Sequence, residues 1–144
     1  MPSNREKIRR LMIAVEQLDQ AYYKVLRTLG IKENAFVLFY AIADGKPYSQ
    51  KRLCDEWAVP RTTLNTIVQE YVEKGYIRLA STGHKEKEIV LTDAGKAFAD
   101  EILTPIFAAE ERAIAPFLNT MFVEQTEELA NRIQSEFHQI KKQN

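Results

Sequence analysis

The chain has 144 residues, a formal net charge of zero, 45% hydrophobic and 28% charged residues, which excludes a disordered or fibrous protein. No apolar run approaches the 18 residues of a membrane-spanning helix, and the N-terminus lacks the pattern of a secretory signal. A single cysteine, Cys54, excludes an intrachain disulfide, two distant histidines disfavour a metal site, and a reducing, cytoplasmic setting is expected.

The first thirty residues predict a long amphipathic helix that ends at Gly30. Ser3 and Glu6 have the spacing of a capping box. Apolar residues then recur at steps of three and four, namely Ile8, Leu11, Met12, Val15, Leu18, Tyr22, Val25, Leu26 and Leu29. A basic start raises binding to a membrane surface as an alternative. Acidic residues are interspersed, so a partner helix in a dimer is the favoured interpretation.

The segment 33–43 is almost continuously apolar, which predicts a central core helix. Turn residues follow, and Ser49 can cap a third helix over 50–57. Pro60 stands where proline is tolerated, at the start of a fourth helix over 61–74 that closes at Gly75.

Two short alternating runs, 76–80 and 88–91, predict a β-hairpin with a polar tip. Thr92 can cap a fifth helix, in which Pro105 is expected to cause a kink or break near Thr104. A last amphipathic helix follows with Phe122, Leu129, Ile133, Phe137 and Ile140 on one stripe. The expected class is therefore mainly α with a small β-hairpin, without a long linker.

Residues 53–68 have the pattern of a helix-turn-helix, in which two helices cross steeply over a short turn. Cys54 is the small residue on the inner face, where a buried thiol usually serves packing rather than redox sensing. Ala58 occupies the turn, where glycine is commoner, so a somewhat different backbone is expected. The apolar residues that hold the second helix in place are Val59, Leu64, Ile67 and Val68.

The second helix of this motif leaves a set of hydrogen-bonding side chains facing outward. These are Arg61, Thr62, Thr63, Asn65, Thr66 and Gln69. Glu and Lys usually fill a solvated helix face because they are better helix formers, so this composition favours contact with DNA bases. The hairpin that follows supplies a wing.

Contacts to the DNA backbone are expected from the first helix of the motif and from the wing, against the alternative of ordinary surface charge. The candidates are Ser49, Lys51, Arg52, Lys85 and Lys87, with His84 a weaker one. Residues 46–88 hold eight basic and six acidic residues, so the local surplus is small. Placement of cations on one face must therefore supply the attraction.

Over essentially its whole length, the chain resembles the MarR family of bacterial transcription regulators. The resemblance rests on 53–68, on 72–77 leading into the wing, and on Leu91-Thr92-Asp93-Ala94-Gly95, similar to the family's Leu-Thr-x-x-Gly element. It implies a homodimer joined by residues 1–30 and 104–144, with 31–103 as a winged helix-turn-helix on a palindromic operator. It also implies repression, relieved in many members by a small ligand.

The wing departs from the family pattern. Gly83 and Lys85 stand where members usually carry Asp-x-Arg, whose arginine enters the minor groove. Lysine keeps the charge but loses the planar guanidinium, and Glu86 and Glu88 oppose phosphate. A weaker or differently arranged wing contact is expected, which places more of the recognition on the 61–74 helix.

Six aromatic residues are candidates for an effector pocket, although such spacing is also typical of plain core. They are Tyr22, Tyr23, Phe36, Phe39, Tyr40 and Trp57. No nucleophile elbow, phosphate loop or metal-ligand motif occurs in the sequence, so an enzyme and a cofactor are not expected. The alternative function is a winged-helix module that binds protein without specific DNA binding.

Overall fold

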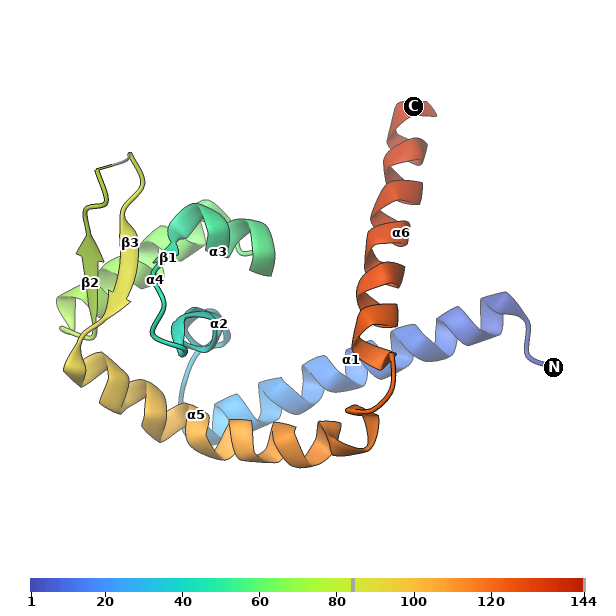
Figure 1. The fold of residues 1–144 in the computed structure, drawn as a ribbon, viewed down its shortest axis with the longest axis horizontal. Helices are drawn as coiled ribbons and strands as arrows, with labels where there is room; N and C mark the ends of the chain where they lie inside the picture. The colour runs from blue at the N-terminus through green and yellow to red at the C-terminus, as the bar shows by residue number, and fades with distance from the viewer. Residues whose placement is uncertain (84, 144) are drawn as a thin grey trace. The chain divides into compact units, whose positions relative to one another are not determined.

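A computed structural model describes residues 1–83 and 85–143, with side chains described up to residue 140. It confirms a mainly helical fold with a small antiparallel sheet (Figure 1). The helices are α1 (Asn4–Leu29), α2 (Glu33–Ile42), α3 (Gln50–Trp57), α4 (Arg61–Glu73), α5 (Asp93–Ile114) and α6 (Phe122–Gln143), with a 3-10 turn η1 (Ala115–Phe117). The strands are β1 (Tyr48–Ser49), β2 (Ile77–Ala80) and β3 (Glu88–Leu91).

The chain divides into two compact units, Met1–Leu103 and Thr104–Asn144. In the first unit, α1 begins with the predicted capping box: the Ser3 hydroxyl accepts from the Glu6 N–H at 3.1 Å, and the Glu6 carboxylate accepts from the Ser3 N–H at 2.8 Å. Gly30 ends α1 in the left-handed conformation, with a φ of 72°. Only Leu26 of α1 is buried, so most of its apolar stripe is exposed in the single chain.

The core of the first unit is built around α2, as its apolar sequence predicts. Leu38 and Phe39 are completely buried. The Phe39 ring meets Tyr71 of α4 edge-on at 4.8 Å between centroids and Phe98 of α5 at 5.1 Å. Each such contact contributes about 0.5–1.5 kcal/mol beyond the burial of apolar area. These contacts join α2, α4 and α5 around one centre.

The sheet has the order β1-β3-β2, with both pairs antiparallel. Ile77 of β2 lies opposite Leu91 of β3, and Tyr48 of β1 lies opposite Ile89. The hairpin of β2 and β3 confirms the prediction from sequence, whereas β1 was not predicted. A two-residue strand has no periodicity of its own and exists only because β3, forty residues further along the chain, offers it backbone partners.

A break of the fifth helix near Thr104 is ruled out, because α5 runs without interruption through Pro105, whereas the alternative of a kink at that place stays a prediction. Proline lacks the N–H that would bond to the Glu101 carbonyl, four residues earlier. Both residues are exposed, so water can satisfy that carbonyl.

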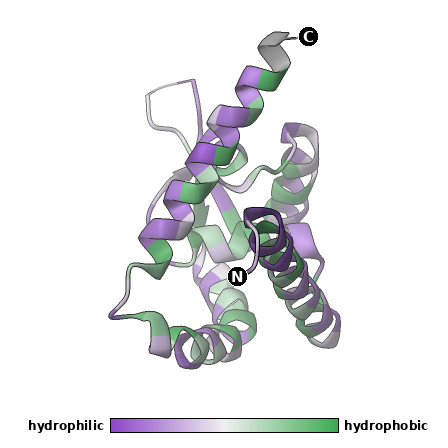
Figure 2. Cartoon of the chain, turned by 90° about the vertical axis from the view of Figure 1, so that its right-hand side faces the viewer, coloured by the Kyte–Doolittle hydropathy of each residue, from purple (hydrophilic) through white to green (hydrophobic). Residues whose placement is uncertain are grey.

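The second unit contains the end of α5, η1 and α6. Phe117 and Phe122 pack across the turn that joins η1 to α6, with 5.0 Å between ring centroids. Figure 2 shows apolar residues alternating with polar ones along α6, and Phe137 and Ile140 are more than half exposed. None of the helices within the described residues is long and apolar enough to cross a membrane.

Candidate nucleic-acid interface

The helices α3 and α4 form a helix-turn-helix with local sequence signals at each boundary. The Ser49 hydroxyl caps α3 by accepting from the Arg52 N–H at 3.0 Å. Ala58 then takes the left-handed conformation that glycine usually provides in this turn, with a φ of 54°. Among the described residues it is the only non-glycine one with a positive φ, at a cost of about 1–2 kcal/mol. The turn therefore keeps its backbone geometry despite the alanine.

The inner face of this motif agrees with the sequence interpretation except at Cys54. Val59, Leu64 and Val68 are buried, and Ile67 is half-buried. The Cys54 thiol residue was expected to be buried, but it is only partly covered. Leu53, the preceding residue of α3, is completely buried. Its side chain, which is larger than that of Cys54, supplies the inward packing of α3 instead.

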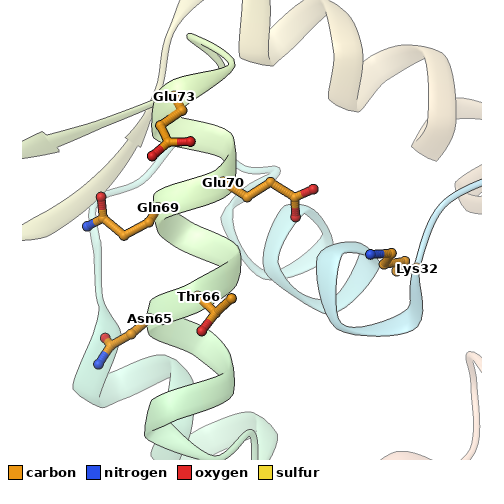
Figure 3. Close-up of a pocket in the computed structure, with 6 residues that line it drawn as sticks. All are labelled: Lys32, Asn65, Thr66, Gln69, Glu70 and Glu73. Atoms are coloured by element: carbon orange, nitrogen blue, oxygen red, sulfur yellow. The ribbon is translucent and has the colours of Figure 1, made fainter.

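The outer face of α4 presents most of the predicted base-reading residues. Arg61, Thr62, Asn65, Thr66 and Gln69 are exposed, whereas Thr63 is half-buried. The side chains of Asn65 and Gln69 project from the same side of α4 (Figure 3). The Thr66 hydroxyl donates to the Thr62 carbonyl at 3.1 Å, which leaves its lone pairs to accept from a ligand.

A shallow hollow runs beside this face, and it includes residues that the sequence analysis missed. It is lined by Lys32, Asn65, Thr66, Gln69, Glu70 and Glu73 (Figure 3). The i, i+4 spacing that joins Asn65 to Gln69 continues to Glu73 and would have revealed that residue. Lys32 reaches the hollow from the start of α2, and only the packing of α2 on α4 places it there.

The residues at α3 that were predicted to contact the DNA backbone already have partners within the chain. The Arg52 guanidinium donates to Glu56 at 2.8 Å and lies over the Tyr48 ring, 4.1 Å from its centroid. The Tyr48 hydroxyl also donates to the Glu56 carboxylate. This cluster ties β1 to α3. Ser49 is engaged as the helix cap, so both residues serve the local structure.

The charges of this cluster are mutually stabilised. The hydrogen bond from Tyr48, followed by that from Arg52, holds the pKa of the Glu56 carboxyl below its usual value. The same hydrogen bond, followed by burial, raises the pKa of the Tyr48 hydroxyl. Lys51 is the freer cation of α3, because its ammonium lies 4.0 Å from Asp55 with both side chains about two-thirds exposed.

The wing brings its acidic residue, rather than its lysines, against the helix-turn-helix. Lys85 and Lys87 are exposed, and His84 lies outside the described residues. One carboxylate oxygen of Glu86 is 3.6 Å from the Arg61 guanidinium, and the other accepts from the backbone N–H of Lys51 at 3.3 Å. The wing tip is thus connected to the N-terminal ends of both α3 and α4.

The base of the wing is held by the Leu-Thr-x-x-Gly segment. The Thr92 hydroxyl accepts from the Gly95 N–H at 3.0 Å and donates to the Gly75 carbonyl at 2.6 Å. The Thr92 N–H donates to the Tyr76 carbonyl at 3.1 Å. A Cβ on Gly95 would lie 1.9 Å from that same carbonyl oxygen. The close approach sets the direction in which the wing leaves α4 and α5 begins.

The six aromatic residues proposed for an effector pocket fall into three places. Four of them form a row: ring centroids are 6.0 Å apart for Tyr22 and Phe36, 5.2 Å for Phe36 and Tyr40, and 5.6 Å for Tyr40 and Trp57. Phe39 belongs to the core described above. Tyr23 is exposed, with the Arg27 guanidinium 5.8 Å from its ring centroid.

This arrangement of α3 and α4, joined by a short turn and followed by a β-hairpin, defines a winged helix-turn-helix protein. Residues 29–87 match the model of the MarR family. A comparison with curated proteins gave no match. The match covers the segment from α2 to β2, and the fold of the whole chain is shared with solved structures of MarR family regulators.

Solved structures of MarR regulators share the fold at low sequence identity. NMB1585, a MarR family regulator from Neisseria meningitidis, has a TM-score of 0.80 and 16% identity, over 96% of this chain and 99% of that one. NadR in complex with 4-hydroxyphenylacetate has a TM-score of 0.70 and 16% identity, over 91% and 96%. MepR of S. aureus in its DNA-binding conformation has a TM-score of 0.65 and 18% identity, over 91% and 97%.

Proposed function

We propose that this protein is a sequence-specific DNA-binding transcriptional repressor that acts in the cytoplasm as a homodimer on a palindromic operator. The observation that carries the proposal is the exposed polar face of α4, with Thr62, Asn65, Thr66 and Gln69 beside a wing that exposes Lys85 and Lys87. Amide and hydroxyl side chains suit base edges in the major groove, and lysines suit phosphates.

The main test is a fluorescence-anisotropy titration with genomic fragments and with random DNA at two salt concentrations. We expect at least one fragment to bind much more tightly than random DNA, and both affinities to fall as salt rises, because phosphate contacts release counterions. Binding no tighter to any fragment than to random DNA would contradict the proposal.

The homodimer is supported by the exposed apolar residues of α1 and α6. Leu18 is 60% exposed and Phe137 is 58% exposed, and neighbouring positions at helical spacing share this exposure. An amphipathic stripe of this length is expected to be covered by a second copy. Two subunits related by a twofold axis would then present two α4 helices to two half-sites.

Leu18→Glu is expected to shift the protein from dimer to monomer, because it places a charge in the centre of the apolar stripe. Sedimentation velocity measures the shift, and operator affinity is expected to fall with it. Gln20→Glu is the matched control, since helical periodicity places residue 20 on the side of α1 away from the stripe. Equal behaviour of the two variants would remove α1 from the dimer interface.

We further propose that a small aromatic ligand regulates DNA binding through the row formed by Tyr22, Phe36, Tyr40 and Trp57. The row supplies ring faces and two hydroxyls, which suit an aromatic acid or phenol. Trp57 is the single tryptophan, so its fluorescence reports on this region alone. We expect 4-hydroxyphenylacetate to quench it with saturation, and a linear, collisional response would contradict this assignment.

The second candidate function is a winged-helix module that binds another protein. It is favoured by the acidic residues near the α4 face, Glu70, Glu73 and Glu86, and by the zero net charge. This function predicts no rise in the anisotropy of labelled DNA even at low salt, where nonspecific electrostatic binding is strongest. The anisotropy titration therefore separates the two functions.

A further inference from the structure

Glu86 is the residue at which the wing, α3 and α4 meet. Its carboxylate lies 3.6 Å from the Arg61 guanidinium at the start of α4 and accepts from the Lys51 N–H in the first turn of α3 at 3.3 Å. A third contact fixes its backbone, since the Glu86 carbonyl accepts from the Thr82 hydroxyl at 3.1 Å. The hairpin therefore holds the backbone of Glu86 in place.

The two groups that Glu86 contacts are those that a DNA phosphate uses. Phosphate oxygens bind free backbone N–H groups at helix N-termini and arginine guanidinium groups, and carboxylate oxygens bind the same donors. Arg61 is the first residue of α4 and is exposed, at the end of the helix where a phosphate at the edge of the major groove would lie. A carboxylate and a phosphate cannot both occupy this place, because their charges repel.

From this geometry we infer that Glu86 occupies a DNA-phosphate site in the free protein and lowers its affinity for DNA. The inference rests on the proposed DNA-binding function and adds an affinity-determining residue to it. The contact is weak enough to be displaced. The Glu86 side chain is 34% exposed and the Arg61 side chain 68% exposed, and exposed ion pairs of this length are readily broken. DNA therefore binds after the carboxylate has moved away from Arg61 and Lys51.

Glu86→Gln tests the inference, because glutamine keeps the length of the side chain and the ability to accept from Lys51. We expect it to tighten binding to both operator and random DNA about threefold to fivefold at low salt. The dependence of log affinity on log salt is expected to steepen by up to about one unit. Arg61, no longer neutralised within the protein, then neutralises one more phosphate, which releases a cation condensed on the DNA.

Glu88→Gln is the matched control. It removes the same charge from the same hairpin, but Glu88 is a β3 residue that pairs in register with Ser49 and Ala80. A general effect of net charge would tighten both variants equally and would overturn the inference. A double-mutant cycle with Arg61→Ala adds a second criterion: the gain from Glu86→Gln must disappear when Arg61 is absent.

The outcomes separate this inference from the proposed function. Binding by the wild-type protein with no gain in Glu86→Gln overturns the inference and leaves the proposed function intact. Weaker binding by Glu86→Gln, with unchanged thermal stability, would show that Glu86 positions the wing for DNA and would also overturn it. Absence of DNA binding by every variant at low salt would overturn both.

Discussion

Gly95→Ala is expected to lower the free energy of unfolding by about 3 kcal/mol, a large share of the total for a small protein. The new Cβ would lie 1.9 Å from the Tyr76 carbonyl oxygen, 2.8 Å from the carbonyl carbon and 3.2 Å from a Leu91 methyl group. Two of these atoms are backbone, which cannot rotate away as a side chain can. Alanine would favour the helix by up to about 1 kcal/mol, but the overlap outweighs this gain.

Urea unfolding measures this loss, and Gly45→Ala is the matched control. Gly45 also has a constrained backbone, with a φ of 76°, but nothing lies within 4 Å of an added Cβ. It should therefore cost only the strain of a left-handed alanine, about 1–2 kcal/mol. A loss at Gly95 no greater than that at Gly45 would mean that the wing base accommodates a methyl group, contrary to the close approach described above.

Asn65→Ala is expected to weaken binding to the operator about tenfold while leaving binding to random DNA nearly unchanged. Asn65 is exposed near the middle of α4, and its amide can bond to two atoms of one adenine edge. Random DNA is held by phosphate contacts, to which this side chain contributes little. Anisotropy titrations with both DNAs at one salt concentration measure the ratio of affinities.

Loss of folding does not complicate this variant, because alanine is a better helix former than asparagine. Asn131→Ala provides the control: the same substitution on α6, at an exposed position opposite the apolar stripe by helical periodicity. Equal losses on operator and random DNA would assign Asn65 to the scaffold, and the reading of bases would then pass to Thr62 and Gln69.

Local sequence was sufficient for the helix boundaries of the candidate interface. Ser49 sets the start of α3 through its hydroxyl, Pro60 precedes α4 with a compatible φ, and Gly75 follows its end. Each of these signals acts within a few residues, so it can be recognised without knowledge of the fold. The exposed face of α4 follows from the same helical periodicity, once Leu64 and Val68 are placed inward.

Local sequence patterns did not predict the contacts between helices and strands. Strand β1 exists through its pairing with β3, and Lys32 approaches the α4 face because α2 packs on α4. Helix α5 continues through Pro105, where both the proline and Glu101, whose carbonyl loses its helical partner, are exposed residues. Each outcome depends on which groups surround a residue in space, and a one-dimensional pattern does not contain that information.

The charged and hydroxyl side chains show most clearly what the sequence determines and what only the folded chain determines. From the sequence alone, a phosphate would be suited by the hydroxyl of Ser49 and by the cations Arg52 and Arg61. The carboxylate of Glu86 would repel a phosphate. Tertiary structure decides that Ser49 caps α3, that Arg52 is held by Glu56, and that Glu86 lies against Arg61 from a hairpin 25 residues away. Residue type determines which partners a side chain can accept, whereas only the folded chain determines which partner is within reach.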